Sequence, residues 1–143
     1  MVTPPIQAPD FRLKDQHGTV VSTSALRGKV VALTSLYTHC PDACPLIADM
    51  VHKAYQRLGE GARRVALVAV SVDPRGDTPE AVRTFLATHH VEQELTYLTG
   101  SFAELKAVWR SYYIGTEARD FTPRAASKGL GHRSWLATPL LCT

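Results

Sequence analysis

The strongest constraint on the fold is a pair of apolar runs, each of which precedes a segment with helical features. Residues 65–72 (VALVAVSV) are almost all apolar or β-branched, which is typical of a strand buried on both faces of a parallel sheet. Residues 30–37 (VVALTSLY) form a second run of this kind. Because parallel neighbours are joined by helical crossovers, the two runs predict an α/β fold with helices covering the sheet.

The segments around these runs continue the alternation of strands and helices. Thr78 and Pro79 are suited to the cap and first turn of a helix, and residues 101–104 (SFAE) form a capping box that begins another. Residues 95–98 (LTYL) between them predict a short strand. The helix expected after the first run has apolar residues at helical spacing: Ile47, Met50, Val51, Ala54, Tyr55 and Leu58.

The ends of the chain differ from its centre. A chain of 143 residues suits one domain, and we expect the proline-rich residues 1–9 to be a linker and residues 10–143 to be a single domain. Extended residues on both sides of the turn at residues 15–18 (DQHG) predict an N-terminal β-hairpin. From about residue 116 the periodic pattern fades, so we expect the C-terminal part to be irregular or incomplete.

Charge and hydropathy exclude several classes of function. The net charge of +3 is scattered, and the longest basic cluster is Arg63-Arg64, so no nucleic-acid footprint is expected. No stretch approaches the roughly 18 apolar residues of a membrane span, and no signal peptide is apparent. Either a soluble protein or a domain whose N-terminal membrane anchor is absent from this sequence fits these observations, and both remain open.

Cys40 and Cys44, within residues 38–45 (THCPDACP), lie where a predicted strand is followed by a predicted helix. If the helix begins near Asp42, their Cα atoms are roughly 6 Å apart, a separation that permits a disulfide. The same spacing lets both sulfurs bind one metal ion, and thiolates select Cu(I) or zinc. A redox pair, a metal site and two inert buried cysteines all remain open from these residues.

A metal site would need a third ligand, for which histidine is the usual choice. We favour His132, because the late segment that contains it could fold back over the cysteines. His39 is expected to point away from Cys40, since adjacent residues of a strand face opposite sides, and His52 is expected to be solvated. The other histidines are assigned to a turn or to a helix end: His17, His89 and His90.

Residues 37–45 (YTHCPDACP) and 71–79 (SVDPRGDTP) resemble the two motifs of the Sco/SenC family of copper chaperones. The resemblance implies a thioredoxin-like fold with a central, mostly parallel sheet flanked by helices and an N-terminal β-hairpin. It also implies a copper ion bound by Cys40, Cys44 and His132. The second motif follows the other central strand, so we expect it to border the same site.

The resemblance further implies a function and a location. Family members deliver copper to the binuclear copper site of cytochrome c oxidase subunit II and are also described as reductants of its cysteines. Thioredoxin-like reductants or other copper chaperones are the further partners implied, and a monomer is expected. An N-terminal helix normally holds such domains on the periplasmic or extracytoplasmic side of a membrane, where the pair can cycle between dithiol and disulfide bond.

Two alternatives use the thiols without copper delivery: a thiol-disulfide oxidoreductase and a redox sensor. Peroxidase chemistry is disfavoured, because Leu33 and Tyr37 stand where peroxiredoxins have proline and threonine. The family's histidine is followed by strands and a helix, whereas here an apolar stretch broken by Pro139 follows His132 and the sequence stops. Cys142 is expected to be a free thiol, with an intermolecular disulfide as the alternative.

Overall fold

The structure, a computed structural model, describes residues 7–116 of the chain. Strands β3, β4 and β5 form a parallel sheet in that order, and β1 and β2 form a separate antiparallel hairpin. The predicted α/β fold and N-terminal hairpin are confirmed. In chain order the elements are β1 (Arg12–Lys14), β2 (Val20–Ser22), the 3₁₀ helix η1 (Thr23–Leu26), β3 (Val30–Leu36), α1 (Ala43–Leu58), the 3₁₀ helix η2 (Gly59–Arg64), β4 (Val65–Ser71), α2 (Pro79–Thr88), β5 (Leu95–Leu98) and α3 (Phe102–Ser111).

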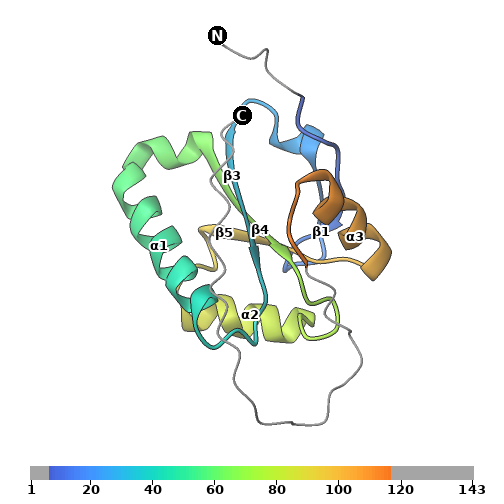
Figure 1. The fold of residues 1–143 in the computed structure, drawn as a ribbon. Helices are drawn as coiled ribbons and strands as arrows, with labels where there is room; N and C mark the ends of the chain where they lie inside the picture. Colours follow the sequence, from blue (N-terminus) through green and yellow to red (C-terminus); the bar gives the residue numbers. More distant parts are fainter. Residues whose placement is uncertain (1–6, 117–143) are drawn as a thin grey trace.

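Strand β4 lies in the middle of the sheet and supplies both halves of the core. Ala69 faces the apolar cluster that α1 and α2 complete, whereas Val68 and Val70 face the cluster that β1 and α3 complete. Figure 1 shows α1 and α3 on opposite sides of the sheet. Helices on both faces explain why this run is continuously apolar: residues 68–71 are buried and residues 65–67 are partly buried.

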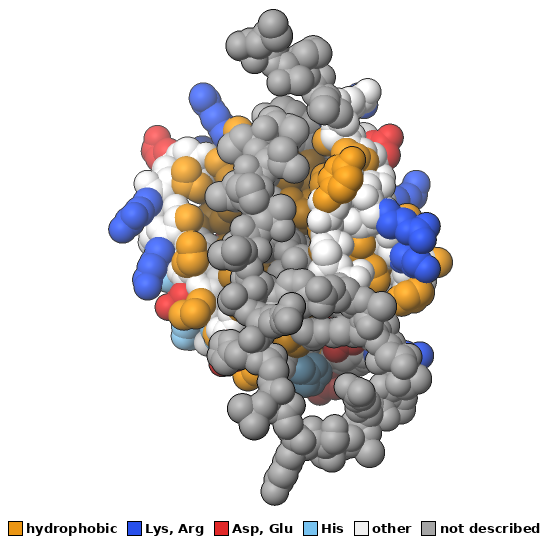
Figure 2. Space-filling view, viewed as in Figure 1, with side chains coloured by type: hydrophobic (Ala, Val, Ile, Leu, Met, Phe, Trp, Pro, Cys, Tyr) orange, Lys and Arg blue, Asp and Glu red, His pale blue; other side chains and the backbone are white. Residues whose placement is uncertain are grey.

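The predicted buried face of the first helix is confirmed only in part: Ile47 and Val51 pack against the core, but other predicted positions do not. Cys44 and Ala48 are its buried residues, one helical turn apart, whereas Met50 is 68% exposed and Leu58 is 37% exposed. The predicted stripe is therefore wrong at these two positions and at the exposed Ala54. Several apolar side chains accordingly lie at the surface on the flank that α1 forms (Figure 2). The small side chain of Ala48 allows the helix to pack closely on the sheet.

The hairpin fixes the outer edge of β5. Lys14 and Thr99 exchange two backbone hydrogen bonds of 3.0 and 2.7 Å. The buried side chain of Gln16 donates to the Leu95 carbonyl at 3.1 Å and accepts from the Tyr97 amide at 2.9 Å. Because these contacts satisfy backbone groups that an edge strand would leave open, the hairpin completes the sheet on this side.

The predicted helix caps are present. The hydroxyl of Thr78 accepts the Ala81 amide at 3.2 Å at the start of α2. Ser101 and Glu104 form the reciprocal capping box of α3. Within residues 7–116, no helix combines the length and the apolar character needed to cross a bilayer. On the face in Figure 2, basic side chains occur on both flanks with acidic ones among them.

Candidate functional site

Cys40 and Cys44 lie together where β3 passes into α1. Cys40 is partly buried in the connecting segment, and Cys44, which is 4% exposed, lies in the first turn of the helix. The Cys44 amide lies 3.4 Å from the Cys40 sulfur and donates to it, and both thiols are free. The segment that follows β3 therefore carries the more accessible thiol, and the first turn of α1 carries the buried one.

The two thiols have opposite pKa shifts. Burial raises the pKa of Cys40, but hydrogen bonds from the amide and thiol of Cys44, the Asp42 amide and the Tyr37 side chain outweigh burial and lower the pKa overall. Burial raises the pKa of Cys44 to about 12, and the nearby charges of Cys40 and Asp77 add to the increase. Cys40 is therefore the thiol that deprotonates first, and Cys44 retains its proton.

The second sequence motif borders this site, as expected, through Asp77. This carboxylate is 3% exposed and accepts four hydrogen bonds. One oxygen accepts the amide of Thr38 at 2.8 Å and its hydroxyl at 2.9 Å. The other accepts the hydroxyls of Ser71 at 2.6 Å and Tyr97 at 2.8 Å. We call Thr38, Ser71, Asp77 and Tyr97 the Asp77 cluster; sequence reasoning placed the motif but missed these bonds.

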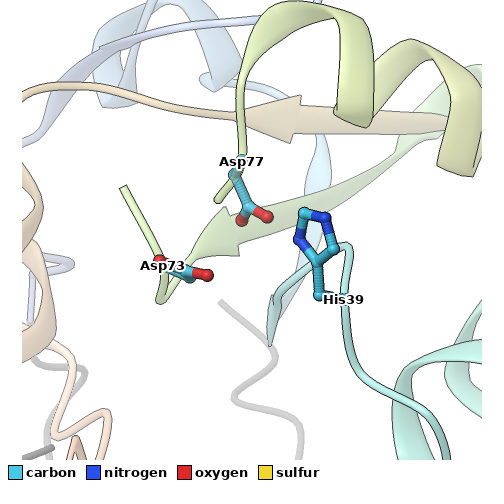
Figure 3. Close-up of side chains that lie close together, drawn as sticks. All are labelled: His39, Asp73 and Asp77. Atoms are coloured by element: carbon cyan, nitrogen blue, oxygen red, sulfur yellow. The ribbon is translucent and has the colours of Figure 1, made fainter. Parts of the chain in front are cut away.

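His39, Asp73 and Asp77 are the group of potential metal ligands that the described residues bring together. Their ligand atoms lie within 4.8 Å of one another, and Figure 3 shows the three side chains converging. The two oxygens of Asp77 already accept two hydrogen bonds each, so neither retains a lone pair for a cation. Asp73 in turn accepts the Gly76 amide at 3.0 Å. The group is a hydrogen-bonded arrangement and is poorly suited to bind metal.

The histidines of residues 7–116 form no ligand group with the two thiols. In residues 7–116, neither cysteine belongs to a group of three metal-ligating side chains. The side chain of His52 is 38% exposed, in line with the expectation, but its ring also lies 3.0 Å from the carboxylate of Glu94, a contact that was not predicted. His89 ends α2 and packs on Phe85 with ring centroids 4.6 Å apart. His132, the predicted third ligand, lies outside the described residues, as do two other positions noted above, Pro139 and Cys142.

A parallel sheet with an N-terminal hairpin, covering helices and two free thiols at a strand-to-helix junction defines a thioredoxin-like domain. The model of the SCO1/SenC family matches residues 3–136. The chain belongs to this family.

Individual relatives agree with this assignment. The mitochondrial SCO1 homolog 1 of Arabidopsis thaliana is 37% identical over 114 residues, which cover 77% of this chain and 34% of the relative. Copper-bound ScoI of Bradyrhizobium japonicum is 29% identical with a TM-score of 0.70, over 95% of this chain and 78% of that one. BsSco, described as a member of the Sco family of cytochrome c oxidase assembly proteins with a disulfide switch, is 27% identical with a TM-score of 0.62, over 73% and 62% of the chains. The chain spans about half the length of the curated Rickettsia relatives that it matches, 50% and 56%.

Proposed function

We propose that this domain binds a copper ion through the thiolates of Cys40 and Cys44. The observation that supports this proposal most directly is the pair of free thiols at the junction of β3 and α1, with the Cys44 amide 3.4 Å from the Cys40 sulfur. Two soft sulfur donors select Cu(I) over hard cations such as magnesium. The similar ScoI of Bradyrhizobium japonicum was solved with copper bound.

His132 is our candidate for the third ligand. The described residues bring no histidine or carboxylate into a ligand group with the two thiols. His132 is the one histidine in residues 117–143 of the sequence, and imidazole is a common partner of thiolates at copper. The resemblance of the motifs to the Sco family supports the same choice.

Copper is cargo in this proposal, and the domain is a metallochaperone. Its target would be the binuclear copper site of cytochrome c oxidase subunit II, in agreement with the description of BsSco as an oxidase assembly protein. The domain would work on the periplasmic or extracytoplasmic side of a membrane, held there by an N-terminal helix. The mitochondrial location of the Arabidopsis relative is consistent with service to an oxidase.

The difference between the two thiols suggests an order of events. The lowered pKa of Cys40 makes its thiolate the first of the two donors available to an incoming ion. Cys44, whose pKa is raised to about 12, gives up its proton only when a metal takes its place. Binding is therefore expected to release protons and to weaken as the pH falls.

The same difference favours thiol-disulfide exchange as a second candidate function. The Cys40 thiolate would attack one sulfur of a target disulfide, forming a mixed disulfide and releasing the target's other thiolate. Cys44, losing its proton, would then attack the Cys40 sulfur and release the second target thiol. Two electrons pass to the target, and this domain ends with a Cys40–Cys44 disulfide.

Anaerobic Cu(I) titration against a competing chelator tests the copper proposal. We expect one tightly bound Cu(I) per chain, lost in Cys40→Ser and in Cys44→Ser and weakened in His132→Ala. Cys142→Ser and His17→Ala are matched controls that should bind as the parent does. Unchanged binding in a Cys40→Ser/Cys44→Ser double variant would contradict the proposal. Catalytic reduction of a protein disulfide by the reduced, metal-free domain would support the second function.

A further inference from the structure

Copper binding does not explain why this fold buries the carboxylate of Asp77. Asp77 is only 3% exposed and, on the preceding argument, is poorly suited to bind a metal. Burying a charge is costly unless hydrogen bonds replace its hydration. The four hydrogen bonds that Asp77 accepts supply this replacement, and their donors show what the carboxylate does.

The donors come from three separate parts of the chain. Thr38 lies in the segment between β3 and Cys40, whereas Ser71 ends β4 and Tyr97 lies within β5. Asp77 itself precedes α2, so the Asp77 cluster joins four segments near the C-terminal ends of the parallel strands. Two further hydrogen bonds stabilise this region: the Val72 amide donates to the Leu36 carbonyl at 3.0 Å, and the Trp109 indole donates to the Ser71 carbonyl at 2.9 Å.

The contact with Thr38 connects the cluster to the thiols. Both the amide and the hydroxyl of Thr38 donate to one oxygen of Asp77, which fixes the backbone as well as the side chain two residues before Cys40. The Cys40 amide then donates to the Tyr37 carbonyl at 3.3 Å, so a tight turn leads from the fixed residue to the first thiol. Cys44 is held independently by α1.

We propose that Asp77 is a positioning residue of the thiol pair: by fixing Thr38 it sets the separation of the Cys40 and Cys44 sulfurs. This role goes beyond copper binding and is measurable without copper, as the stability of the Cys40–Cys44 disulfide. Glutathione disulfide can serve as the oxidant. It takes two electrons from the dithiol, the S–S bond of the pair forms, and two molecules of reduced glutathione accept the two protons.

Two substitutions of Asp77 distinguish the effect of its hydrogen-bond geometry from the effect of its charge. In Asp77→Asn the amide oxygen can still accept from Thr38, and the amide nitrogen can donate to the hydroxyls of Ser71 and Tyr97, since hydroxyls accept as well as donate. Asp77→Asn therefore retains the geometry and removes the charge. Asp77→Ala removes both. Asp49→Ala is the control, because this carboxylate is exposed on α1 and forms an exposed ion pair with Lys53, at 3.6 Å.

The test is the equilibrium of the metal-free protein with glutathione redox buffers, followed by thiol trapping and mass spectrometry. We expect Asp77→Ala to lower the equilibrium constant for disulfide formation about tenfold, because misplaced reacting groups lose effective concentration. For this two-electron couple, tenfold corresponds to about 30 mV. Asp77→Asn should stay within about twofold of the parent, and Asp49→Ala should match the parent.

Either of two results would overturn the proposal. An Asp77→Ala protein that folds and has the parental equilibrium constant would show that the cluster does not position the thiols. An Asp77→Asn protein that shifts as far as Asp77→Ala would show that charge is responsible. If Asp77→Ala does not fold, Thr38→Val removes one of the two Thr38 bonds and should shift the constant in the same direction, about threefold; an unchanged constant would overturn the proposal equally. Since copper is absent throughout, failure here is distinct from failure of copper binding.

Discussion

Replacing Tyr97 with phenylalanine isolates the energy of one bond in the Asp77 cluster. The Tyr97 ring is 0% exposed and packs edge-on against Phe85 with centroids 6.3 Å apart, and its hydroxyl donates to Asp77 at 2.8 Å. Burial and the charge of Asp77 raise the pKa of Tyr97, so the hydroxyl is a donor throughout the neutral range. Phenylalanine preserves the ring and its packing, so the loss is confined to the hydrogen bond.

The expected cost follows from the kind of bond that is removed. A hydrogen bond to a charged group contributes about 1.5–3 kcal/mol. The hydroxyl of Ser71 still donates to the same oxygen of Asp77, at 2.6 Å, so that oxygen keeps a partner. We therefore expect Tyr97→Phe to lower the free energy of unfolding by about 2 kcal/mol.

Urea unfolding of the reduced, metal-free protein measures this change. The midpoint should fall and the m-value should stay constant, as for a change in stability alone. Tyr113→Phe is the matched control, because Tyr113 is 85% exposed, and it should change the free energy by less than about 0.5 kcal/mol. A loss below about 0.5 kcal/mol in Tyr97→Phe would refute the assignment of a strong buried bond.

Four further predictions concern the described residues. Iodoacetamide at pH 8 should alkylate Cys40 much faster than Cys44, as read by peptide mass spectrometry; equal rates would show that the thiol pKa values are not ordered as described. The pKa of Cys44 rises from 9.0 to about 12 on folding. The contribution of this thiol to the free energy of unfolding is therefore present below pH 9.0 and is lost as the pH rises toward 12. Urea unfolding of the parent and of Cys44→Ser across this pH range measures the loss. Gln16→Ala removes two bonds to the backbone of β5 and should cost about 2–3 kcal/mol, with faster hydrogen exchange in β5 as the specific sign. Gly76→Ala would press a methyl group against the Asp73 carboxylate and should lower the melting temperature through a loss of about 1–2 kcal/mol, whereas an unchanged melting temperature would mean that the loop adjusts freely.

The sequence predicted those parts of the fold that local interactions decide. The run at β4, Val65–Ser71, is apolar because both faces of the strand are covered, and the caps at Thr78 and Ser101 involve residues only three positions apart. The face of α1 was predicted less well, because six apolar residues allow more than one buried stripe. Packing against the sheet selected the stripe with Cys44 and the small Ala48.

The site shows the same division between local and distant contacts. The closeness of Cys40 and Cys44 follows from their separation of only four residues at the strand-to-helix junction, although Cys40 lies outside α1, which begins at Ala43. By contrast, Thr38 and Asp77 are 39 residues apart, and no local pattern indicates that they share a hydrogen bond. The pairing of His52 with Glu94 spans 42 residues and was missed for the same reason. The sequence signal for the Asp77 cluster was the presence of polar residues at the ends of two central strands. This signal indicated which segments lie near the thiols, but it did not indicate which residues share hydrogen bonds.

X-ray absorption at the copper edge tests the central proposal most directly, because it counts the sulfur atoms bound to the ion. The sample is the Cu(I)-loaded protein in a Cys142→Ser background, which leaves Cys40 and Cys44 as the only cysteines of the sequence. We predict two sulfur neighbours and one nitrogen neighbour, with the nitrogen signal lost in His132→Ala. A copper ion surrounded by nitrogen and oxygen alone would contradict binding by the thiol pair.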